Sequence, residues 1–570
     1  MANLSQQKRE RMLAFLNKVK EEHKDDDETL IALDEIENEL NSKKYGLVWE
    51  KHEEEVDRMM QDNIPVFTEV KEREIKATDE NSYNFLLEGD NLHSLKLLEK
   101  THAGKIDVIY IDPPYNTGND FFKYNDKIID ENDLFRHSKW LSFMYARLYI
   151  AKKLLKQTGI IFVSIGDDEL GNLVTLCKEI FGEENYIATC PRIAKRTSNK
   201  GNYFKPTKDY VLVIAKNKQR LNWQFGVVQK INEKDFKFVD SRGRYKKNGA
   251  SLYQPSLDSR PNQRYFIECP DGSLVIPPGN VFPDKKEDGA LVVPIDNNDK
   301  CWRWSRDKYI KDKDLLIFTK ASPKCPLVDQ DNNPSKYNIY DKVYLEDKQD
   351  NTLLPEDVIY DYVNSQGTKE LNKQGINFAF SKPVGLIKYL ISLTRLNNEI
   401  TILDFFAGSG TTAQAVLELN KEDGGNRKFI LCTNNENNIC EEVTYERIKR
   451  VIHGYADVEG IPANLKYFKT DFIPKDADDV SEELLSHIKE MVELENGITL
   501  DNKHYLIVLS DEQADELAKN WSNYEDVKAI YVSRNVLFTS EQDALFSNTE
   551  IHIIPDYYFE YELKEVGETW

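Results

Sequence analysis

The sequence lacks the features that mark several large classes of protein. No run of about 18 apolar residues occurs, so we expect no membrane-spanning helix. The first residues, MANLSQQKRERMLAFLNKV, contain no apolar stretch ending in a small-residue cleavage site, which predicts no secretion signal. The seven cysteines include no CxxC pair, which predicts neither a metal site nor a disulfide framework. These absences together favour a cytoplasmic protein with reduced thiols.

Two kinds of nucleotide site are also missing. No GxxxxGK[ST] phosphate-binding signature or nuclease motif is apparent, so DNA cleavage driven by ATP would require a separate subunit. The only G-x-G turn that follows an apolar run, at 408–410, lacks the third glycine of a dinucleotide site. This spacing argues against a dehydrogenase.

Charge is distributed unevenly along the chain. The net charge is −22, which by itself argues against a polyanionic partner. Residues 191–250, however, contain sixteen Lys and Arg against four Asp and Glu, and aromatic residues such as Tyr203 and Phe204 lie among them. A basic run can be no more than a solvated face, but this mixture also suits phosphate contacts beside base stacking.

A chain of 570 residues is too long for one hydrophobic core, and its texture changes several times. We expect an acidic helical region at 1–80, an α/β core at 81–220, an irregular β-leaning insert at 221–375, a second part of the α/β core at 376–470 and a small acidic α/β domain at 471–570. Short apolar runs at 107–111, 159–165 and 210–215 predict buried strands, and 141–159 predicts a helix that ends at Gly159.

The first motif with chemical meaning is Asp112-Pro113-Pro114-Tyr115, directly after a predicted buried strand. Ligands of α/β proteins bind at the carboxyl ends of strands. The Asp112 carboxylate and the Pro113 carbonyl can both accept from one NH2 group, while Tyr115 can stack on the ring that carries it. The motif therefore predicts a site for a planar ring with an exocyclic amine.

The second motif is DFFAGSGTT at 404–412, between a predicted strand at 400–403 and a helix at 411–419. A tight glycine turn at such a junction lets the backbone approach a nucleoside-type ligand. At the end of the next predicted strand, Glu436 could accept from ribose hydroxyls, although a plain surface acid is nearly as good an interpretation.

Together the two motifs resemble those of the amino-methyltransferases that modify exocyclic nitrogens in DNA with S-adenosylmethionine. The catalytic motif precedes the donor loop, an order that resembles the β group of these enzymes: a permuted Rossmann-like α/β sheet with the target recognition domain inserted between its halves. Further segments across residues 80–473 resemble the modification (Mod) subunits of type III restriction–modification systems. They are LLEGDNLHSLKLLE (86–99), WLSFMYARL (140–148), GIIFVSIGDDE (159–169), WRWSRDKY (302–309), GTKELNKQG (367–375), FSKPVGLIKYLI (380–391) and NLKYFKTDFI (464–473).

The resemblance implies a role for individual residues. Asp112, Pro113, Pro114 and Tyr115 would be catalytic and hold a flipped adenine. The methyl donor would contact Asp90, Lys382, Pro383, Asp404, Phe406, Ala407, Gly408, Gly410, Thr411 and Glu436. DNA would contact Arg192, Lys195, Arg196, Lys200, Lys205, Arg242, Arg244 and Arg303. Lys208 departs from the pattern, because the family usually has His at this position.

The resemblance implies methylation of N6 of adenine in double-stranded DNA, with base flipping, in a homodimer that has a possible restriction subunit as partner. Three alternatives stay open: an adenine methyltransferase without a nuclease partner, a cytosine-N4 methyltransferase and a catalytically idle specificity subunit. Two intact motifs argue against idleness. Trp302 and Trp304 could be core or recognition residues. The target sequence cannot be read from the chain.

Overall fold

The computed structural model describes residues 4–24, 26–41, 49–117, 135–197, 203–221, 225–228, 233–349, 352–378, 381–394, 396 and 398–568. The chain forms two compact units. The first combines Met1–Phe225 with Glu356–Trp570, and the second is Gly226–Pro355. Residues 356–375, which are predicted to be part of the insert, therefore belong to the first unit.

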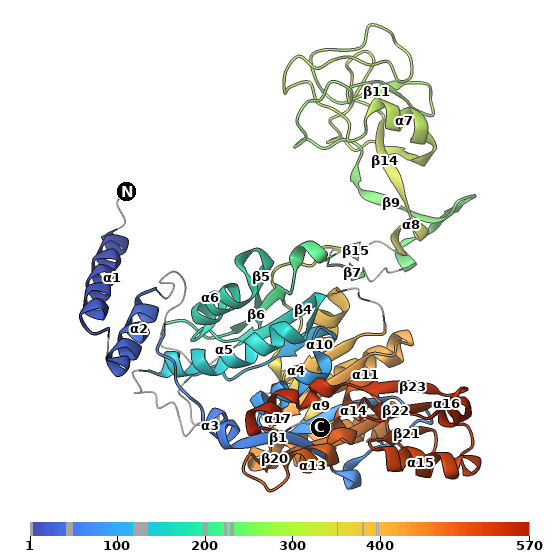
Figure 1. The fold of residues 1–570 in the computed structure, drawn as a ribbon. Coiled ribbons are helices and arrows are strands. Elements are labelled where there is room, and N and C mark those ends of the chain that lie inside the picture. Colours follow the sequence, from blue (N-terminus) through green and yellow to red (C-terminus); the bar gives the residue numbers. More distant parts are fainter. Residues whose placement is uncertain are drawn as a thin grey trace. The chain divides into compact units, whose positions relative to one another are not determined.

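The first unit is built on a nine-stranded sheet in the order β1-β20-β2-β17-β16-β3-β4-β6-β5. Strands β1, β4, β5, β6 and β20 of this sheet are labelled in Figure 1. The six neighbouring strands from β20 to β4 are parallel, whereas β1 is antiparallel to β20, and β6 is antiparallel to both β4 and β5. The strands are β1 (Asn63–Glu69), β2 (Tyr83–Glu88), β3 (Ile106–Ile111), β4 (Leu155–Ile165), β5 (Tyr186–Ile193), β6 (Lys208–Ala215), β16 (Thr401–Asp404), β17 (Lys428–Thr433) and β20 (Asn464–Pro474).

The central strands are apolar on both faces, as expected for a sheet covered on each side by helices. Every residue of β2 and β3 is buried. On β3, Ile109 and Ile111 join the core formed with α4, α5 and α6, while the alternate residue Val108 is also fully buried. The helices of the unit's core are α4 (Asn91–His102), α5 (Arg136–Leu154), α6 (Leu170–Phe181), α9 (Asn364–Lys373), α10 (Val384–Leu393), α11 (Thr411–Asp423) and α12 (Glu446–His453).

Two strands are adjacent in space although they are far apart in sequence. β16 lies between β17 and β3, with Leu403 paired to Ile109 and Asp404 paired to Leu431. Because all three strands are parallel, their carboxyl ends meet at one edge of the sheet. The segment after each strand therefore contributes to the same site, and this fold is the α/β architecture that the sequence predicts.

Two predicted boundaries are wrong. The helix at 141–159 ends at Leu154 instead of Gly159, because pairing of Leu155 with Ile106 already draws the following residues into β4. Residues 1–80 are not entirely helical: after α1 (Leu4–Glu22), α2 (Asp27–Asn41) and α3 (Glu55–Asp62), the run NIPVFTE forms β1. This run is short, apolar and bounded by polar residues, which is the pattern of a strand.

The last hundred residues contain a small parallel sheet in the order β21-β22-β23, which agrees with the expected α/β character. Its residues Tyr531 and Ile554, together with Phe559 and Leu563 of the closing segment, enter the same core as α4. The elements after β20 are α13 (Val480–Ser486), α14 (Ile488–Asn496), β21 (Tyr505–Val508), α15 (Asp511–Lys519), β22 (Ala529–Ser533), α16 (Ser540–Phe546), β23 (Glu550–Ile554) and α17 (Glu560–Val566).

The second unit has a core of its own around Trp302, whose indole Nε1 donates to the carbonyl of Tyr265 at 2.8 Å. Trp302 is fully buried and Trp304 nearly so, which assigns both to the core. The main sheet of the unit, β12-β14-β9-β8, is antiparallel. The elements are β8 (Phe238–Asp240), β9 (Gly243–Ser251), β10 (Ile267–Glu268), β11 (Leu274–Ile276), α7 (Arg306–Asp312), β12 (Leu316–Lys320), β13 (Val328–Asp329), β14 (Tyr337–Tyr344) and α8 (Glu346–Gln349), with the pair β7 (Val227–Val228) and β15 (Thr352–Leu353).

Within the part of the chain that is described, no helix is long and apolar enough to cross a bilayer.

Candidate functional site

The site lies at the carboxyl edge of the large sheet. Asp90 follows β2, Glu436 follows β17, the glycine loop follows β16, and the Asp-Pro-Pro-Tyr motif follows β3. Since these strands are neighbours in that order, the residues predicted to hold a donor lie on three adjacent strands and the catalytic motif on the next. The sheet thus places the two motifs side by side.

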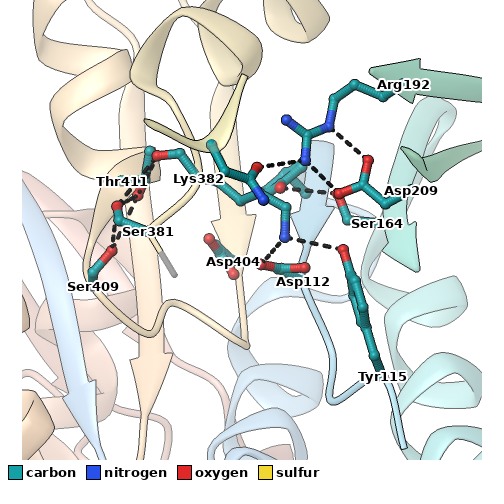
Figure 2. Close-up of polar contacts among 12 residues, drawn as sticks. Asp112, Tyr115, Ser164, Arg192, Asp209, Ser381, Lys382, Asp404, Ser409 and Thr411 are labelled. Carbon is teal, nitrogen blue, oxygen red and sulfur yellow. Dashed lines mark hydrogen bonds and ion pairs between the residues drawn. The ribbon is translucent and has the colours of Figure 1, made fainter. Parts of the chain in front are cut away.

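Lys382 joins the catalytic motif to a distant segment of the chain. Figure 2 shows its side chain reaching from the segment before α10 to the end of β3. The ammonium Nζ donates to Asp112 Oδ2 at 2.5 Å and to Tyr115 Oη at 3.0 Å, and the side chain is only 10% exposed. The sequence predicts that Lys382 contacts the methyl donor, whereas its ammonium contacts Asp112 and Tyr115 of the Asp-Pro-Pro-Tyr motif.

Two acceptors of the motif remain open. Asp112 Oδ1 is buried and has no hydrogen-bond partner among the described residues. The Pro113 carbonyl likewise receives no hydrogen bond from the residues that the structure describes. A buried acceptor without a partner costs about 1–3 kcal/mol, and a ligand N–H that donates a hydrogen bond to it would recover this free energy. The pair is suited to one NH2 group, as the sequence predicts.

Tyr115 is held in place by residues after β4 and on α5. A β-carbon at Gly166 would lie 2.9 Å from the Cδ2 atom of Tyr115, so only glycine lets the ring pack this closely. Trp140 Nε1 donates to the Pro114 carbonyl at 2.8 Å, which fixes the proline step. Burial, reinforced by the charge of Asp112, raises the pKa of the Tyr115 phenol well above its ordinary value, so the hydroxyl stays neutral.

The residue after the motif anchors the loop. Asn116 has φ of +53°, a left-handed conformation that Asn tolerates better than most residues, and its amide donates to Glu169. The Glu169 side chain is fully buried and also contacts His137 Nδ1 at 2.7 Å and Asn172 Nδ2 at 2.7 Å. The IGDDE segment therefore supports the catalytic motif through Gly166 and Glu169.

The glycine loop is organised by the buried Asp404. Its Oδ1 accepts from the backbone N–H of Phe406 at 3.0 Å and its Oδ2 from Thr412 Oγ1 at 2.6 Å, so one carboxyl group closes the turn. Burial raises the pKa of Asp404 to about 7, and the nearby charge of Asp112 adds to the shift while these two hydrogen bonds oppose it. Asp404 therefore shapes the loop and is not free to bind a ligand.

Gly408 and Gly410 both have left-handed backbones, with φ of +49° and +72°. A β-carbon on Gly408 would have only the Phe406 carbonyl within 4 Å, at 3.8 Å, so the backbone borders open space. Nearby, Asn434 Nδ2 is a buried donor without a partner among the described residues. An open backbone cradle with an unused polar group fits a nucleoside-type donor.

A buried arginine ties the loop to the Lys382 segment. Arg447 donates to Thr411 Oγ1 at 2.9 Å, to the Ser409 carbonyl at 3.2 Å and to Ser381 Oγ at 3.3 Å. Thr411 Oγ1 in turn donates to the Lys382 carbonyl at 3.4 Å. Burial lowers the pKa of Arg447 to about 10. No sequence pattern pointed to this residue, because an arginine on a helix looks like a surface residue.

The remaining residues predicted to contact the methyl donor are held by the backbone around them. Asp90 caps α4 by accepting from the N–H of Leu92 at 2.7 Å, and it also receives Arg147 Nη2 at 3.2 Å. Pro383 directly precedes α10, at the N-cap position. The backbone N–H of Ala407 donates to the Cys432 carbonyl at 3.1 Å, and Glu436 begins a short turn after β17. All of them lie along the predicted edge.

Arg192 is a correction to the predicted DNA contacts. Its guanidinium is fully buried and pairs with both oxygens of Asp209, and it also donates to the Tyr362 carbonyl at 2.6 Å and to Asn364 Oδ1 at 2.8 Å. The charge pattern of a sequence cannot tell such an arginine from an exposed one. Arg192 instead contributes, with backbone hydrogen bonds between β5 and Ile359, to holding residues 356–364 in the first unit.

The other predicted DNA contacts differ in their availability. Lys195, Arg196 and Lys205 are exposed between β5 and β6, and Lys200 lies outside the described residues. In the second unit, Arg242 pairs with Asp347, Arg244 with Glu233 and Arg303 with Asp341. Arg303 is mostly buried, which makes it a structural residue in this state. Lys208 donates to Asp167 Oδ1 at 3.2 Å and to Tyr210 Oη.

Comparison with known proteins agrees with this geometry. A family model described as DNA methylase matches residues 106–445, which cover both motifs. The chain belongs to this DNA methylase family.

This DNA methylase is similar to named relatives over most of its length. It is 31% identical to the Mod subunit of the type III restriction–modification enzyme EcoPI of Escherichia phage P1, over 85% of this chain and 78% of the phage protein. It is 32% identical to the StyLTI Mod subunit of Salmonella typhimurium, over 68% of this chain and 60% of that protein. It is 31% identical to the type II methyltransferase M.KpnI of Klebsiella pneumoniae, over 61% and 79%.

The buried Asp404 of this DNA methylase predicts a specific pH dependence. Because its pKa is raised to about 7, the fold favours the protonated carboxyl, and the stability from this group is lost as pH rises toward 7. Between pH 5.5 and 7, the free energy of unfolding of the wild type should fall relative to Asp404→Asn, by at most about 1.4 kcal/mol per pH unit. Urea unfolding at several pH values measures this difference.

A matched control is Asp423→Asn. The hydrogen bond from Arg427 lowers the pKa of Asp423, so its titration lies below this range and its variant should track the wild type from pH 5.5 to 7. If the free energy of unfolding changed with pH equally in wild type and Asp404→Asn, the raised pKa of Asp404 would be contradicted.

Proposed function

We propose that this protein transfers a methyl group from S-adenosylmethionine to N6 of an adenine flipped out of double-stranded DNA, as the modification subunit of a type III restriction–modification system in the cytoplasm. The open acceptors of Asp112 and Pro113, beside Tyr115 and one strand from the glycine loop, carry this proposal. The names of the type III relatives favour this biological setting. Adenine is favoured by the resemblance of the Asp-Pro-Pro-Tyr motif to the family's pattern, in which aspartate precedes the prolines.

The donor would be held along the edge formed by β2, β17 and β16. The backbone at Gly408 and Gly410 would approach the donor closely, Phe406 would lie beside it, and Glu436 would accept from its ribose. Asp90 shapes the neighbouring turn. When bound, S-adenosylmethionine supplies an electrophilic methyl carbon on a sulfonium, and no described residue has to activate that carbon.

The chain's own residues would activate the amine by orientation. An aromatic amine is a poor nucleophile because its lone pair is delocalised into the ring. Asp112 and the Pro113 carbonyl would each accept one N–H, which turns the lone pair out of the ring plane, toward the donor side of the sheet. The carboxylate would also stabilise the positive charge that develops on nitrogen.

In the transfer itself the nitrogen forms a bond to the methyl carbon as the carbon–sulfur bond breaks. The amine then carries one proton too many, and this proton leaves to water. Asp112 Oδ2 is already held by Lys382, so Asp112 serves as an acceptor and charge partner and is not assigned as an obligate base.

The target base must leave the duplex to reach this pocket. Flipping costs a few kcal/mol, which stacking on the Tyr115 ring offsets. The ring is packed on Gly166 and tethered through its hydroxyl to Lys382, so it presents a fixed face.

Exposed residues beside the pocket would contact the DNA. Tyr210 at the start of β6 pairs with Ile165 at the end of β4, so the segment joining β5 to β6 begins and ends at the catalytic edge. This segment carries Lys195, Arg196 and Lys205, and its Tyr203 and Phe204 are 95% and 91% exposed. Lysine and arginine would bind phosphates, and the two rings would stack on bases. Sequence reading would fall to the second unit, inside the predicted region 221–375.

Self-association and a restriction subunit are part of the same proposal. The acidic ends of the chain are the candidate surfaces, with seven basic against twenty-four acidic residues in the last hundred. We expect a dimer by light scattering at micromolar concentration with DNA present; a monomer under these conditions would count against it.

The catalytic proposal predicts a specific genomic mark. Sequencing that detects modified bases, in DNA from cells expressing the wild type, should find N6-methyladenine at one short sequence, because the site takes an amine-bearing base and the second unit would read the sequence around it. Asp112→Ala should abolish the mark, since it removes the acceptor that orients the amine.

The control variant is Asp168→Ala, which removes an exposed acid after β4 at the same edge and should leave the mark intact. N6-methyladenine that is absent from the wild type or persists in Asp112→Ala would refute the mechanism, and N4-methylcytosine in its place would select the cytosine alternative.

Arg192 on β5 and Arg196 in the segment joining β5 to β6 should respond differently to substitution. Arg196→Ala should weaken binding to every DNA sequence without changing stability, and it should reduce the slope of log affinity against log salt by about 0.9 for each phosphate that the variant can no longer neutralise. Arg192→Ala should destabilise the fold by about 3–5 kcal/mol, because it leaves Asp209 buried without its partner. Salt titrations by fluorescence anisotropy and urea unfolding separate the two effects. An unchanged salt slope in Arg196→Ala would remove this segment from the interface.

A further inference from the structure

Lys382 occupies a position that donor binding does not explain. Its backbone is tied to the donor side, where its carbonyl accepts from Thr411 Oγ1 at 3.4 Å, but its ammonium lies between Asp112 and the hydroxyl of Tyr115. The charge is also 5.0 Å from the centroid of the Tyr115 ring. A ligand that stacks on Tyr115 and donates to Asp112 would therefore lie close to this charge.

The ammonium has a donor to spare. A lysine ammonium carries three N–H donors, and Asp112 Oδ2 and Tyr115 Oη account for two of them. The Tyr115 hydroxyl is neutral, because burial raises its pKa well above the ordinary value, so it accepts this bond without cancelling the charge. The third N–H remains for a ligand that enters between the carboxylate and the ring.

We propose that Lys382 donates this third hydrogen bond to the ring nitrogen next to the target amine, which is N1 in adenine. The proposal rests on the proposed function and adds a residue that reads the flipped base. Asp112 and the Pro113 carbonyl present acceptors, and Lys382 presents a donor beside them. This donor–acceptor order is complementary to an edge that offers an amine N–H next to a ring acceptor.

The same order rejects half of the bases. Adenine and cytosine have an amine next to an unprotonated ring nitrogen. At the same positions of their Watson–Crick edges, guanine (O6 and N1–H) and thymine (O4 and N3–H) have a carbonyl oxygen next to a ring N–H, so they would place an acceptor against Asp112 and a donor against Lys382. Buried groups left unpaired in this way are heavily penalised. Lys382 would therefore exclude guanine and thymine, while pocket size would have to separate adenine from cytosine.

A hydrogen bond at N1 withdraws electron density from the amine, so it does not speed the transfer step. The contribution of Lys382 is to hold the base in register with Asp112, and its loss should act on binding and KM more than on kcat. This separates Lys382 from Asp112, whose loss should act on kcat.

The test compares adenine with 1-deazaadenine, which replaces N1 by C–H, at the target position of a duplex that carries the mapped recognition sequence. Binding is measured by fluorescence anisotropy with S-adenosylhomocysteine present, so no turnover is needed. The wild type should bind the adenine duplex about 10- to 100-fold more tightly, the range for a hydrogen bond to a charged group. Lys382→Met should reduce this preference to less than about threefold.

Lys388→Met is the matched control. Lys388 lies on the following helix and pairs with Glu418 and Glu422, away from the catalytic motif, so this variant should keep the wild-type preference. Calorimetry with S-adenosylhomocysteine alone should give the same affinity for Lys382→Met and wild type within about threefold. A loss above about tenfold would place the ammonium at the donor and overturn the proposal.

Two further results would also overturn the proposal. The first is a wild type that binds the adenine and 1-deazaadenine duplexes equally, which is measured without any variant. The second is a full preference for adenine that survives in Lys382→Met. Failure of the proposed function is a separate outcome, because the wild type would then leave no methylated adenine in the genomic mapping that precedes this test.

Discussion

The parallel pairing of β16 with β3 is the constraint on which the rest of the site depends. Leu403 pairs with Ile109, so the segment that follows β16 and the segment that follows β3 begin at the same level of the sheet. Parallel strands need long connections, and here the connection includes an entire second unit. The strand order thus keeps the two motifs, which are nearly 300 residues apart in the sequence, at one edge of the sheet.

Buried charged side chains connect the segments at this edge. Arg447 fixes the glycine loop to the Lys382 segment, Lys382 joins that segment to Asp112, and Arg192 with Asp209 fastens the chain that returns from the second unit. Pairs of this kind cost desolvation and often add little net stability. Their main contribution is structural specificity, because each buried side chain is satisfied only when the backbone segments that it joins take one relative position.

The sequence predicts the strands and both motifs well, since continuous apolar runs and glycine turns are local signals. It also predicts the edge, because parallel strands place their carboxyl ends together. It could not predict which lysine or arginine is buried. Arg192 and Arg196 lie in the same basic run, yet one is enclosed and the other exposed, and only the pairing of β5 with β6 separates them. The sequence predicts that Lys382 contacts the methyl donor, because the backbone of its motif lies beside the glycine loop. Its four-carbon side chain instead carries the charge to Asp112 and Tyr115.

The two acids at the heart of the site show how environment divides identical chemistry. Asp404 is the last residue of β16 and Asp112 follows the adjacent strand β3. The two oxygens of Asp404 accept from the Phe406 N–H and from Thr412 Oγ1, and burial raises its pKa to about 7. Asp112 gives one oxygen to Lys382 and leaves the other open. One carboxyl group therefore closes the glycine loop, and the other keeps a single acceptor open beside Tyr115 at the same edge of the sheet.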